Sequence, residues 1–211
     1  MTVDLTKRVS LRVEKLTRRF GFRTVFKELE FDCGFGDSVC ITGPNGSGKS
    51  TLLKIIAGLL PPTSGEITFS VNDKPADAEA VHQYVRTVSP ELNLYDELTG
   101  CENLDFLCRI SGKSISQDEI EDSLDNIGLS ERGDDLFGAY SSGMKQRLKL
   151  AVALISNPPV LLLDEPSLNL DDNGREIVHR VMEQQTHQGI LIYATNEEDE
   201  FRFGGKIVRL G

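Results

Sequence analysis

A glycine-rich segment at residues 43–50 constrains the fold more than any other part of the sequence. It reads Gly-Pro-Asn-Gly-Ser-Gly-Lys-Ser and matches the pattern G-x-x-x-x-G-K-[ST] at every fixed position. Such a loop holds a phosphate where a strand enters it and a helix leaves it, because backbone N–H groups and a helix N-terminus then converge on one anion. The flanks predict both, a strand over residues 38–42 and a helix over residues 49–60 that ends at Pro61 and Pro62. The chain is therefore predicted to have an α/β fold.

The residue types in this loop suit a nucleoside triphosphate with Mg²⁺. Glycines allow the tight curvature and the close approach of phosphate oxygens that such a loop needs. Lys49 is expected to neutralise the β- and γ-phosphates, and the Ser50 hydroxyl to ligate Mg²⁺. The alternative, a glycine-rich turn with an incidental lysine, is disfavoured by the strand and helix on either side. The residues expected to contact the nucleotide here are Gly43, Pro44, Asn45, Gly46, Ser47, Gly48, Lys49, Ser50 and Thr51.

Two acidic residues follow an apolar run at residues 160–163. Carboxylates at the carboxyl end of a parallel strand lie at the edge where such sheets bind ligands. Asp164 is expected to join the Mg²⁺ shell, and Glu165 to polarise a water molecule for in-line attack on the γ-phosphate. A strand that simply ends in a solvated loop is the alternative, and the phosphate loop in the same chain favours the nucleotide interpretation.

Strands and helices alternate over most of the chain, which predicts a largely parallel sheet. The expected strands of this sheet lie at residues 38–42, 160–163, 190–193 and 206–210. Short β-rich runs predict a small antiparallel sheet beside it, at residues 10–16, 29–32 and 66–71.

Helices and polar loops dominate between residues 95 and 146. Ser116 and Glu119 form a capping-box pattern, after which Ile120 and Leu124 recur at helical spacing. This stretch predicts a helical subdomain inserted into an α/β core of residues 1–94 and 147–211. The 211 residues are thus expected to form a single domain.

Composition excludes several classes of function. Asp and Glu (33) outnumber Lys and Arg (23), and the formal charge of −10 argues against a general nucleic-acid binder. No run approaches the ~18 apolar residues of a membrane span, so a membrane role needs a separate partner chain. Residues 1–8 lack the pattern of a secretory signal, and a cytoplasmic location is expected. The four cysteines have no C-x-x-C spacing and are expected to be reduced thiols rather than metal ligands.

A segment just before the acidic strand separates this chain from other nucleotide hydrolases. Residues 140–147 read Tyr-Ser-Ser-Gly-Met-Lys-Gln-Arg and resemble the ABC signature, whose commonest form is Leu-Ser-Gly-Gly-Gln, with Ser141 and Gly143 retained. A serine hydroxyl and free N–H groups at the start of the helix that runs to about Ile155 would form a second anion site. Taken without the other motifs, this segment is also compatible with an ordinary N-capped helix.

The resemblance to ABC ATP-binding subunits covers almost the whole chain in the family's order. It implies a P-loop NTPase core that binds ATP and Mg²⁺, with Phe20 stacking on the adenine ring. Residues 168–171 match the loop that touches a partner subunit, and residues 94–104 match the region that receives the coupling helix of a permease. The signature of one subunit closes over the nucleotide of another. The implied partners are a second nucleotide-binding subunit, by default another copy, and an integral-membrane permease that holds the chain at the inner face of the cell membrane.

The sequence departs from the family pattern at two positions. The family's glutamine that senses the γ-phosphate and Mg²⁺ aligns with Pro90 or with Glu91, which makes Glu91 the candidate contact. The family's switch histidine falls on Asn196, whose amide donates hydrogen bonds but carries no exchangeable charge. The implied catalytic set is Glu165, Lys49 and Asn196. The remaining histidines are expected at the surface and are His82, His179 and His187.

Two other functions remain open at this stage. A non-transport ABC ATPase is one, although 211 residues leave no room for a second cassette or a long coiled coil. A binding module that hydrolyses ATP weakly is the other, favoured by Asn196 and opposed by Glu165. The chain is expected to end at its last strand without a regulatory domain. That brevity resembles exporter-type subunits, including the haem-export (cytochrome c maturation) group, whereas the cargo is not encoded here.

Overall fold

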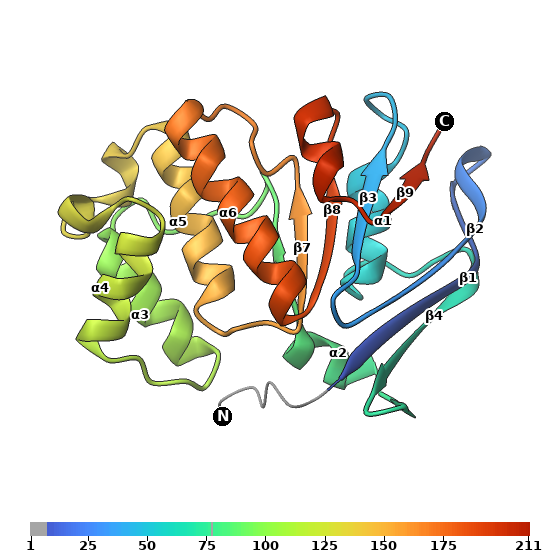
Figure 1. Ribbon diagram of the computed structural model, residues 1–211, viewed down its shortest axis with the longest axis horizontal. Helices are drawn as coiled ribbons and strands as arrows, with labels where there is room; N and C mark the ends of the chain where they lie inside the picture. Colours follow the sequence, from blue (N-terminus) through green and yellow to red (C-terminus); the bar gives the residue numbers. More distant parts are fainter. Residues whose placement is uncertain (1–7, 77) are drawn as a thin grey trace.

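Five parallel strands form the central sheet, in the order β6-β7-β8-β3-β9 (Figure 1). The computed structural model describes residues 8–76 and 78–211, so the expected lack of a signal at the start of the chain lies largely outside the described residues. The parallel sheet confirms the predicted fold class. Its strands are β3 (Ser38–Thr42), β6 (Val85–Val88), β7 (Val160–Asp164), β8 (Ile190–Ala194) and β9 (Lys206–Arg209).

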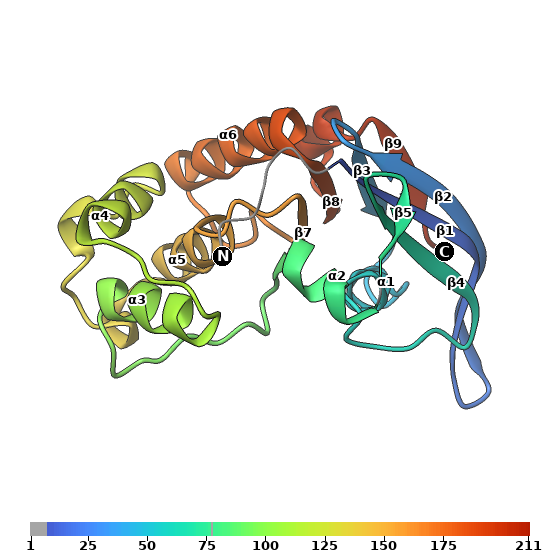
Figure 2. The same ribbon diagram turned by 90° about the horizontal axis from the view of Figure 1, so that it is seen from below.

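Both faces of this sheet are buried at its centre, because β3, β7 and β8 send alternate residues into different cores. Leu162 of β7 packs with helix α1 (Lys49–Ile56), whereas its neighbour Leu161 packs with α5 (Ser142–Leu154) and α6 (Asp172–Gln188). Figure 2 shows α6 on one side of the sheet, and α1 with α2 (Ala78–Tyr84) on the other. Burial on two faces explains why residues 160–163 are apolar without alternation.

The predicted antiparallel sheet is confirmed and lies against the other side of α1. It has the strand order β2-β1-β4-β5, and its inward residues share one core with α1 and the parallel sheet. Its three predicted strands are all longer than the sequence predicted, and the β1–β2 hairpin turns at Gly21 and Phe22. The bounds are β1 (Val9–Phe20), β2 (Arg23–Gly34), β4 (Ser64–Val71) and β5 (Lys74–Pro75).

Helices α3 (Gly100–Ile110), α4 (Gln117–Asn126) and one face of α5 enclose a separate core. The predicted capping box is present, since Ser116 accepts a hydrogen bond from the Glu119 N–H and the Glu119 carboxylate accepts one from the Ser116 N–H. Helix α5 runs across residue 146, the expected limit of the helical subdomain. Short 3-10 helices complete the chain as η1 (Ser130–Arg132), η2 (Phe137–Ala139) and η3 (Glu198–Phe203). Within the described residues, no helix is long and apolar enough to span a bilayer.

The structure corrects two sequence predictions. Helix α1 ends at Ile56 rather than near residue 60, because Gly58 adopts a left-handed φ of 74° and its N–H turns back to the Ile55 carbonyl. His179, expected at the surface, has only 14% of its side chain exposed. All four cysteines are free; Cys101 is partly exposed and the other three are buried.

The two-sided burial of β7 predicts a large penalty for truncating it. Leu162→Ala should lower the free energy of unfolding by about 2–5 kcal/mol, because the fully buried side chain leaves a cavity between two packed layers. Leu59→Ala, at an exposed position after α1, should change it by less than about 0.5 kcal/mol. Urea unfolding followed by circular dichroism measures both. Equal effects would contradict the assignment of β7 to the sheet interior.

Candidate active site

The loop between β3 and α1 is shaped by two close backbone approaches. A Cβ on Gly43 would lie 2.2 Å from the Leu210 carbonyl oxygen, and one on Gly48 would lie 2.2 Å from Cγ1 of Val25. Both glycines also have positive φ angles, 151° and 104°. Any side chain at either position would displace β9 or β2, so the glycines follow from packing as well as from loop curvature.

Helix α1 begins without a capping side chain. Its N-cap is Gly48, and no side chain accepts a hydrogen bond from the first turn. The Ser47 N–H is used within the loop, where it donates to the Pro44 carbonyl. The N–H groups of the first helical turn therefore remain available, at the positive end of the helix dipole, for an anionic ligand.

Lys49 extends from this turn into the interior. Its side chain is 7% exposed, its Nζ donates to the Gly43 carbonyl at 2.9 Å, and it lies 3.5 Å from Oε1 of Glu165. Glu165 itself has a left-handed φ of 50°, a conformation that costs a non-glycine residue about 1–3 kcal/mol. The bond from its N–H to the Ala194 carbonyl helps to hold it there. The buried ammonium group of Lys49 thus faces the carboxylate of Glu165, a residue with a strained backbone, at the carboxyl edge of the sheet.

Asp164 and Ser50 provide oxygen atoms suited to a hard cation. Burial is the main cause that raises the pKa of Asp164, while a hydrogen bond from Ser50 and the charge of Lys49 act to lower it. Its Oδ1 atom is buried and has no hydrogen-bond partner. Among residues 8–76 and 78–211, no cluster of three or more His, Cys, Asp or Glu side chains is arranged to hold a metal. One carboxylate and one hydroxyl fit Mg²⁺, which typically takes its other ligands from phosphates and water.

A cavity of about 490 Å³ joins the predicted loop residues to the antiparallel sheet. Phe20 lies at one end of this cavity, 51% exposed, with the Arg18 guanidinium 4.3 Å from its ring centroid. Arg23, which no sequence motif predicts, also reaches the loop, and its Nη2 donates to the Gly46 carbonyl at 3.3 Å. No motif links Arg23 to the loop, because only the β1–β2 hairpin brings it there. The cavity is lined by Phe20, Arg23, Val25, Asn45, Gly46, Gly48, Lys49, Ser50, Thr51 and Glu165.

The two departures from the family pattern differ in their contacts. Asn196 follows β8 and donates from Nδ2 to Oδ1 of Asn45 at 3.1 Å, so it reaches the phosphate loop. Glu91 instead pairs with Lys54, with 2.7 Å between Oε2 and Nζ. A metal contact by Glu91 would require this pair to open.

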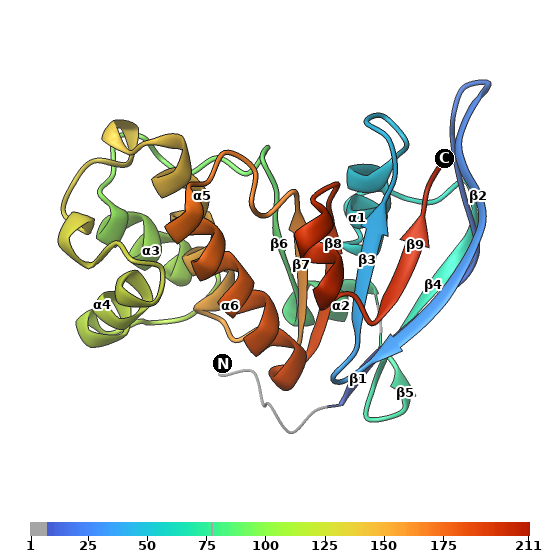
Figure 3. The same cartoon turned by 45° about the horizontal axis from the view of Figure 1, so that its top comes forward.

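The signature residues lie away from this cavity. Ser141 caps α5 and accepts a hydrogen bond from the Met144 N–H at 3.2 Å, while Gly143 lies against Leu170 in the loop that follows Glu165. Neither Ser141 nor Gly143 lines the cavity. In the view of Figure 3, strands β6, β7 and β8 lie between α5 and α1. One chain therefore does not bring its own signature to its own phosphate loop.

Comparison with curated sequences finds relatives along most of the chain. Residues 26–168 match the family model described as ABC transporter. The linearmycin resistance ATP-binding protein LnrL of Bacillus subtilis is 32% identical over 92% of this chain, which spans 63% of that protein. The cytochrome c biogenesis ATP-binding export protein CcmA of Vibrio cholerae is 32% identical, over 95% of this chain and 98% of its own length.

Solved structures give the same result for the fold. An ATP-binding cassette in a dimeric, post-hydrolysis state bound to ADP and Pi superposes with a TM-score of 0.82 at 26% identity. The alignment covers 95% of this chain and 94% of that one.

The buried position of Lys49 predicts that ATP binding depends on it. Lys49→Ala should abolish detectable ATP binding, because backbone dipoles alone would then face several phosphate charges. Lys27→Ala, an exposed lysine on β2, is the matched control and should bind ATP as the wild type does. Titration with a fluorescent ATP analogue measures both affinities. Micromolar binding by Lys49→Ala would refute this role of the loop.

Proposed function

Because this chain belongs to the ABC transporter family, we propose that it binds and hydrolyses MgATP as one of two paired nucleotide-binding subunits that drive a membrane permease. The observation that carries this proposal is the single cavity where Lys49, Ser50, Thr51 and Glu165 meet the exposed ring of Phe20. A basic residue, a hydroxyl and a carboxylate at one end suit a triphosphate. An aromatic face at the other end suits a base.

In the proposed mechanism, the triphosphate takes over the contacts that Lys49 now makes with Glu165. Phosphate oxygens would accept hydrogen bonds from Lys49 and from the first turn of α1, which leaves the Glu165 carboxylate free to accept a proton from an attacking water. Asp164 and Ser50 would hold Mg²⁺, which neutralises phosphate charge when bound. Asn196 would donate a hydrogen bond to the γ-phosphate from its position beside Asn45.

Pairing of two chains follows from the separation of the signature and the phosphate loop. The first turn of α5 has N–H groups for a second set of phosphate contacts, yet it is not part of the cavity of its own chain. In the proposed dimer, Ser141 and Gly143 of each subunit would complete the site of the other. A Cβ on Gly143 would lie 3.4 Å from Cδ2 of Leu170, so the loop after Glu165 runs close beside the start of α5 and would sense this closure.

The pairing proposal predicts that blocking hydrolysis traps a dimer. Glu165→Gln keeps the size and hydrogen bonding of the side chain but removes the base, so with saturating MgATP it should accumulate as a closed dimer. Light scattering with size-exclusion chromatography measures this, and the Glu165→Gln, Lys49→Ala double variant should stay monomeric. A monomer at saturating MgATP would contradict an ATP-bridged homodimer.

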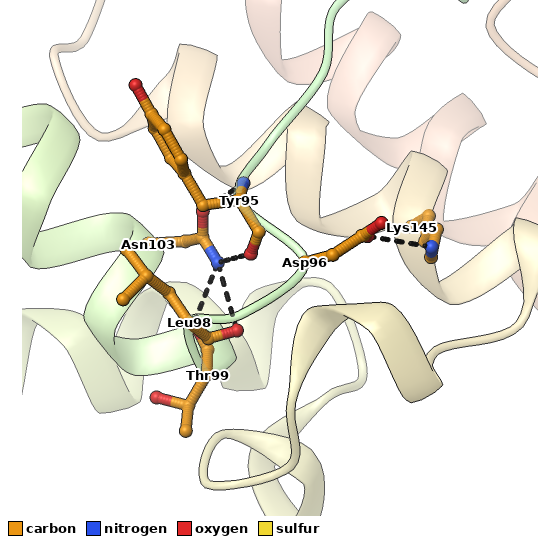
Figure 4. A network of polar contacts seen from close by, with 6 residues as sticks. All are labelled: Tyr95, Asp96, Leu98, Thr99, Asn103 and Lys145. Atoms are coloured by element: carbon orange, nitrogen blue, oxygen red, sulfur yellow. Dashed lines mark hydrogen bonds and ion pairs between the residues drawn. The ribbon is translucent and has the colours of Figure 1, made fainter.

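The surface proposed to receive the permease is organised by a buried asparagine. Asn103 is fully buried and fastens the loop before α3 through bonds with Tyr95, Leu98 and Thr99 (Figure 4). In the same loop, Asp96 pairs with Lys145 of α5 at 3.1 Å. A movement of this loop caused by the permease would therefore be transmitted through the Asp96–Lys145 pair to α5, the helix that begins at the signature.

An apolar groove beside that loop indicates the chemistry of the permease segment. The groove has a volume of about 210 Å³ and lies between α3, α5 and β6. Arg86 and Lys113 line it and donate only to backbone carbonyls, and burial lowers the pKa of both. No carboxylate of the described residues pairs with either cation. We therefore propose that the docking segment of the permease is apolar with an acidic residue, which would hold this chain at the inner face of the membrane.

Asn196 reaches the phosphate loop with a neutral amide where the family has a histidine, so we predict slow ATP hydrolysis that a histidine at this position would accelerate. Losing one preorganised donor typically costs ~10²–10³ in kcat, and a neutral amide recovers part of that. Asn196→His should therefore raise kcat by about tenfold without a comparable change in ATP affinity. Steady-state phosphate release measures turnover, with Asn196→Ala as the control that should lower it. An unchanged or lower kcat in Asn196→His would mean that Glu91 and Asn196 form a competent rearranged site.

A further inference from the structure

A buried carboxyl group behind the candidate active site has no role in the mechanism above. Glu200 lies on η3 and is 0% exposed. Both of its carboxyl oxygens are buried without a hydrogen-bond partner. The Ser167 hydroxyl is likewise buried and unpartnered, and Thr195 is fully buried. The hydroxyls of Ser167 and Thr195 lie close enough to the carboxyl group to lower its pKa, yet neither of its oxygens has a hydrogen bond of normal geometry, whereas buried polar groups are normally satisfied.

The charges around Glu200 disfavour its ionised form. Burial is the largest cause that raises its pKa, and the nearby acids Glu197 and Asp199 raise it further. The hydroxyls of Ser167 and Thr195 act in the opposite direction. Among the described residues, no cation contributes to the pKa shift of Glu200. The nearby cations pair with other acids, since Arg175 lies 3.8 Å from Glu197 and His179 lies 3.9 Å from Asp199. Burial is the main cause that raises the pKa of Tyr193 and of Cys40, and the charge of Glu200 in turn raises both further. A neutral carboxyl group has an O–H to donate to a neighbouring hydroxyl.

The hydroxyl groups near Glu200 belong to the two segments that carry Glu165 and Asn196. Ser167 is two residues after Glu165, and Thr195 directly precedes Asn196. The Tyr193 hydroxyl of β8 donates to the Glu200 carbonyl of η3 at 2.7 Å. In the turn between these elements, the N–H of Glu197 donates to the Thr195 hydroxyl at 3.0 Å. Glu200 is therefore held beside both segments that carry the reacting end of the site.

We propose that Glu200 is a positioning residue whose carboxyl group joins the hydroxyls of Ser167 and Thr195 and so sets where Glu165 and Asn196 stand relative to the bound phosphates. This inference rests on the proposed ATPase function. The carboxyl group touches neither nucleotide nor water in this role. It acts by tying the loop after β7 to the end of β8, and a shift of about 1 Å there is enough to slow chemistry by ~10²-fold.

Three variants test this role by turnover. Glu200→Ala should lower kcat by about 10–100-fold while the Kd for ATP stays within about threefold, because the phosphate loop is untouched. Glu200→Gln keeps a neutral hydrogen-bonding group and should retain kcat within about threefold at pH 7. Glu198→Gln, an exposed acid on the same helix, is the matched control. The proposal is overturned if Glu200→Ala keeps wild-type turnover, or if Glu200→Gln loses as much as Glu200→Ala.

The pH dependence of Tm and of kcat gives a second test, because a side chain that only fills space would leave both pH dependences unchanged. A raised pKa in the folded state means that the stability contributed by neutral Glu200 is present in acid and is lost as pH rises through the folded pKa. The difference in Tm between Glu200→Gln and the wild type should therefore grow in favour of the variant from pH 5 to pH 9. Wild-type kcat should fall on the alkaline side while Glu200→Gln stays flat. A difference in Tm that is independent of pH would overturn the proposal.

The melting experiment separates two kinds of failure. If the wild type releases no phosphate at any pH, the proposed ATPase function fails, yet the pH dependence of Tm still reports on the carboxyl of Glu200. If the wild type hydrolyses ATP and both Glu200 variants behave as it does, the function stands and the positioning role fails.

Discussion

The ammonium group of Lys49 is held in the protein interior between the Gly43 carbonyl and the Glu165 carboxylate, and much of the structure around it follows from that position. A buried cation is tolerated only where oppositely charged or hydrogen-bonding groups surround it. Lys49 starts α1, Gly43 begins the loop after β3, and Glu165 follows β7, so these elements must meet at one edge of the sheet. The same contacts describe a place for phosphate oxygens, since a triphosphate offers Lys49 a stronger set of acceptors than one carboxylate.

The second constraint is the left-handed backbone at Glu165. Its strain is offset by the bond to the Ala194 carbonyl, by the turn in which the Leu168 N–H donates to Glu165, and by packing of the loop on Gly143. The loop after β7 therefore lies between the carboxylate and the helix that begins with the signature. A movement of α5 reaches Glu165 through a few direct contacts, without a long pathway.

The helical part of the molecule supplies the other end of that connection. Its core is distinct from the cores on the two faces of the parallel sheet, and α5 contributes side chains both to it and to the core on one sheet face. Two polar links cross to α5, the Asp96–Lys145 pair and the bond from Lys149 to the Pro90 carbonyl. They attach the loop before α3 and the segment around Glu91 to the same helix. In an ABC ATP-binding subunit, this arrangement joins the proposed permease surface to the segment that carries Glu91.

The sequence by itself determined the elements with strong local signals. The phosphate loop, β3, β7, the capping box at Ser116 and the helix that starts after Ser141 lie where predicted, because glycine geometry, caps and apolar runs are local properties of the chain. Strand β6 was missed, since four residues of mixed polarity carry no periodicity, and the end of α1 was placed too late, since the apolar pattern continues past Gly58. The tertiary structure alone decided which residues meet: Arg23 at Gly46, Asn196 at Asn45, Glu91 at Lys54 and Glu200 behind Ser167 and Thr195. These contacts join segments far apart in the chain, and their energies depend on burial and charge that no single segment contains.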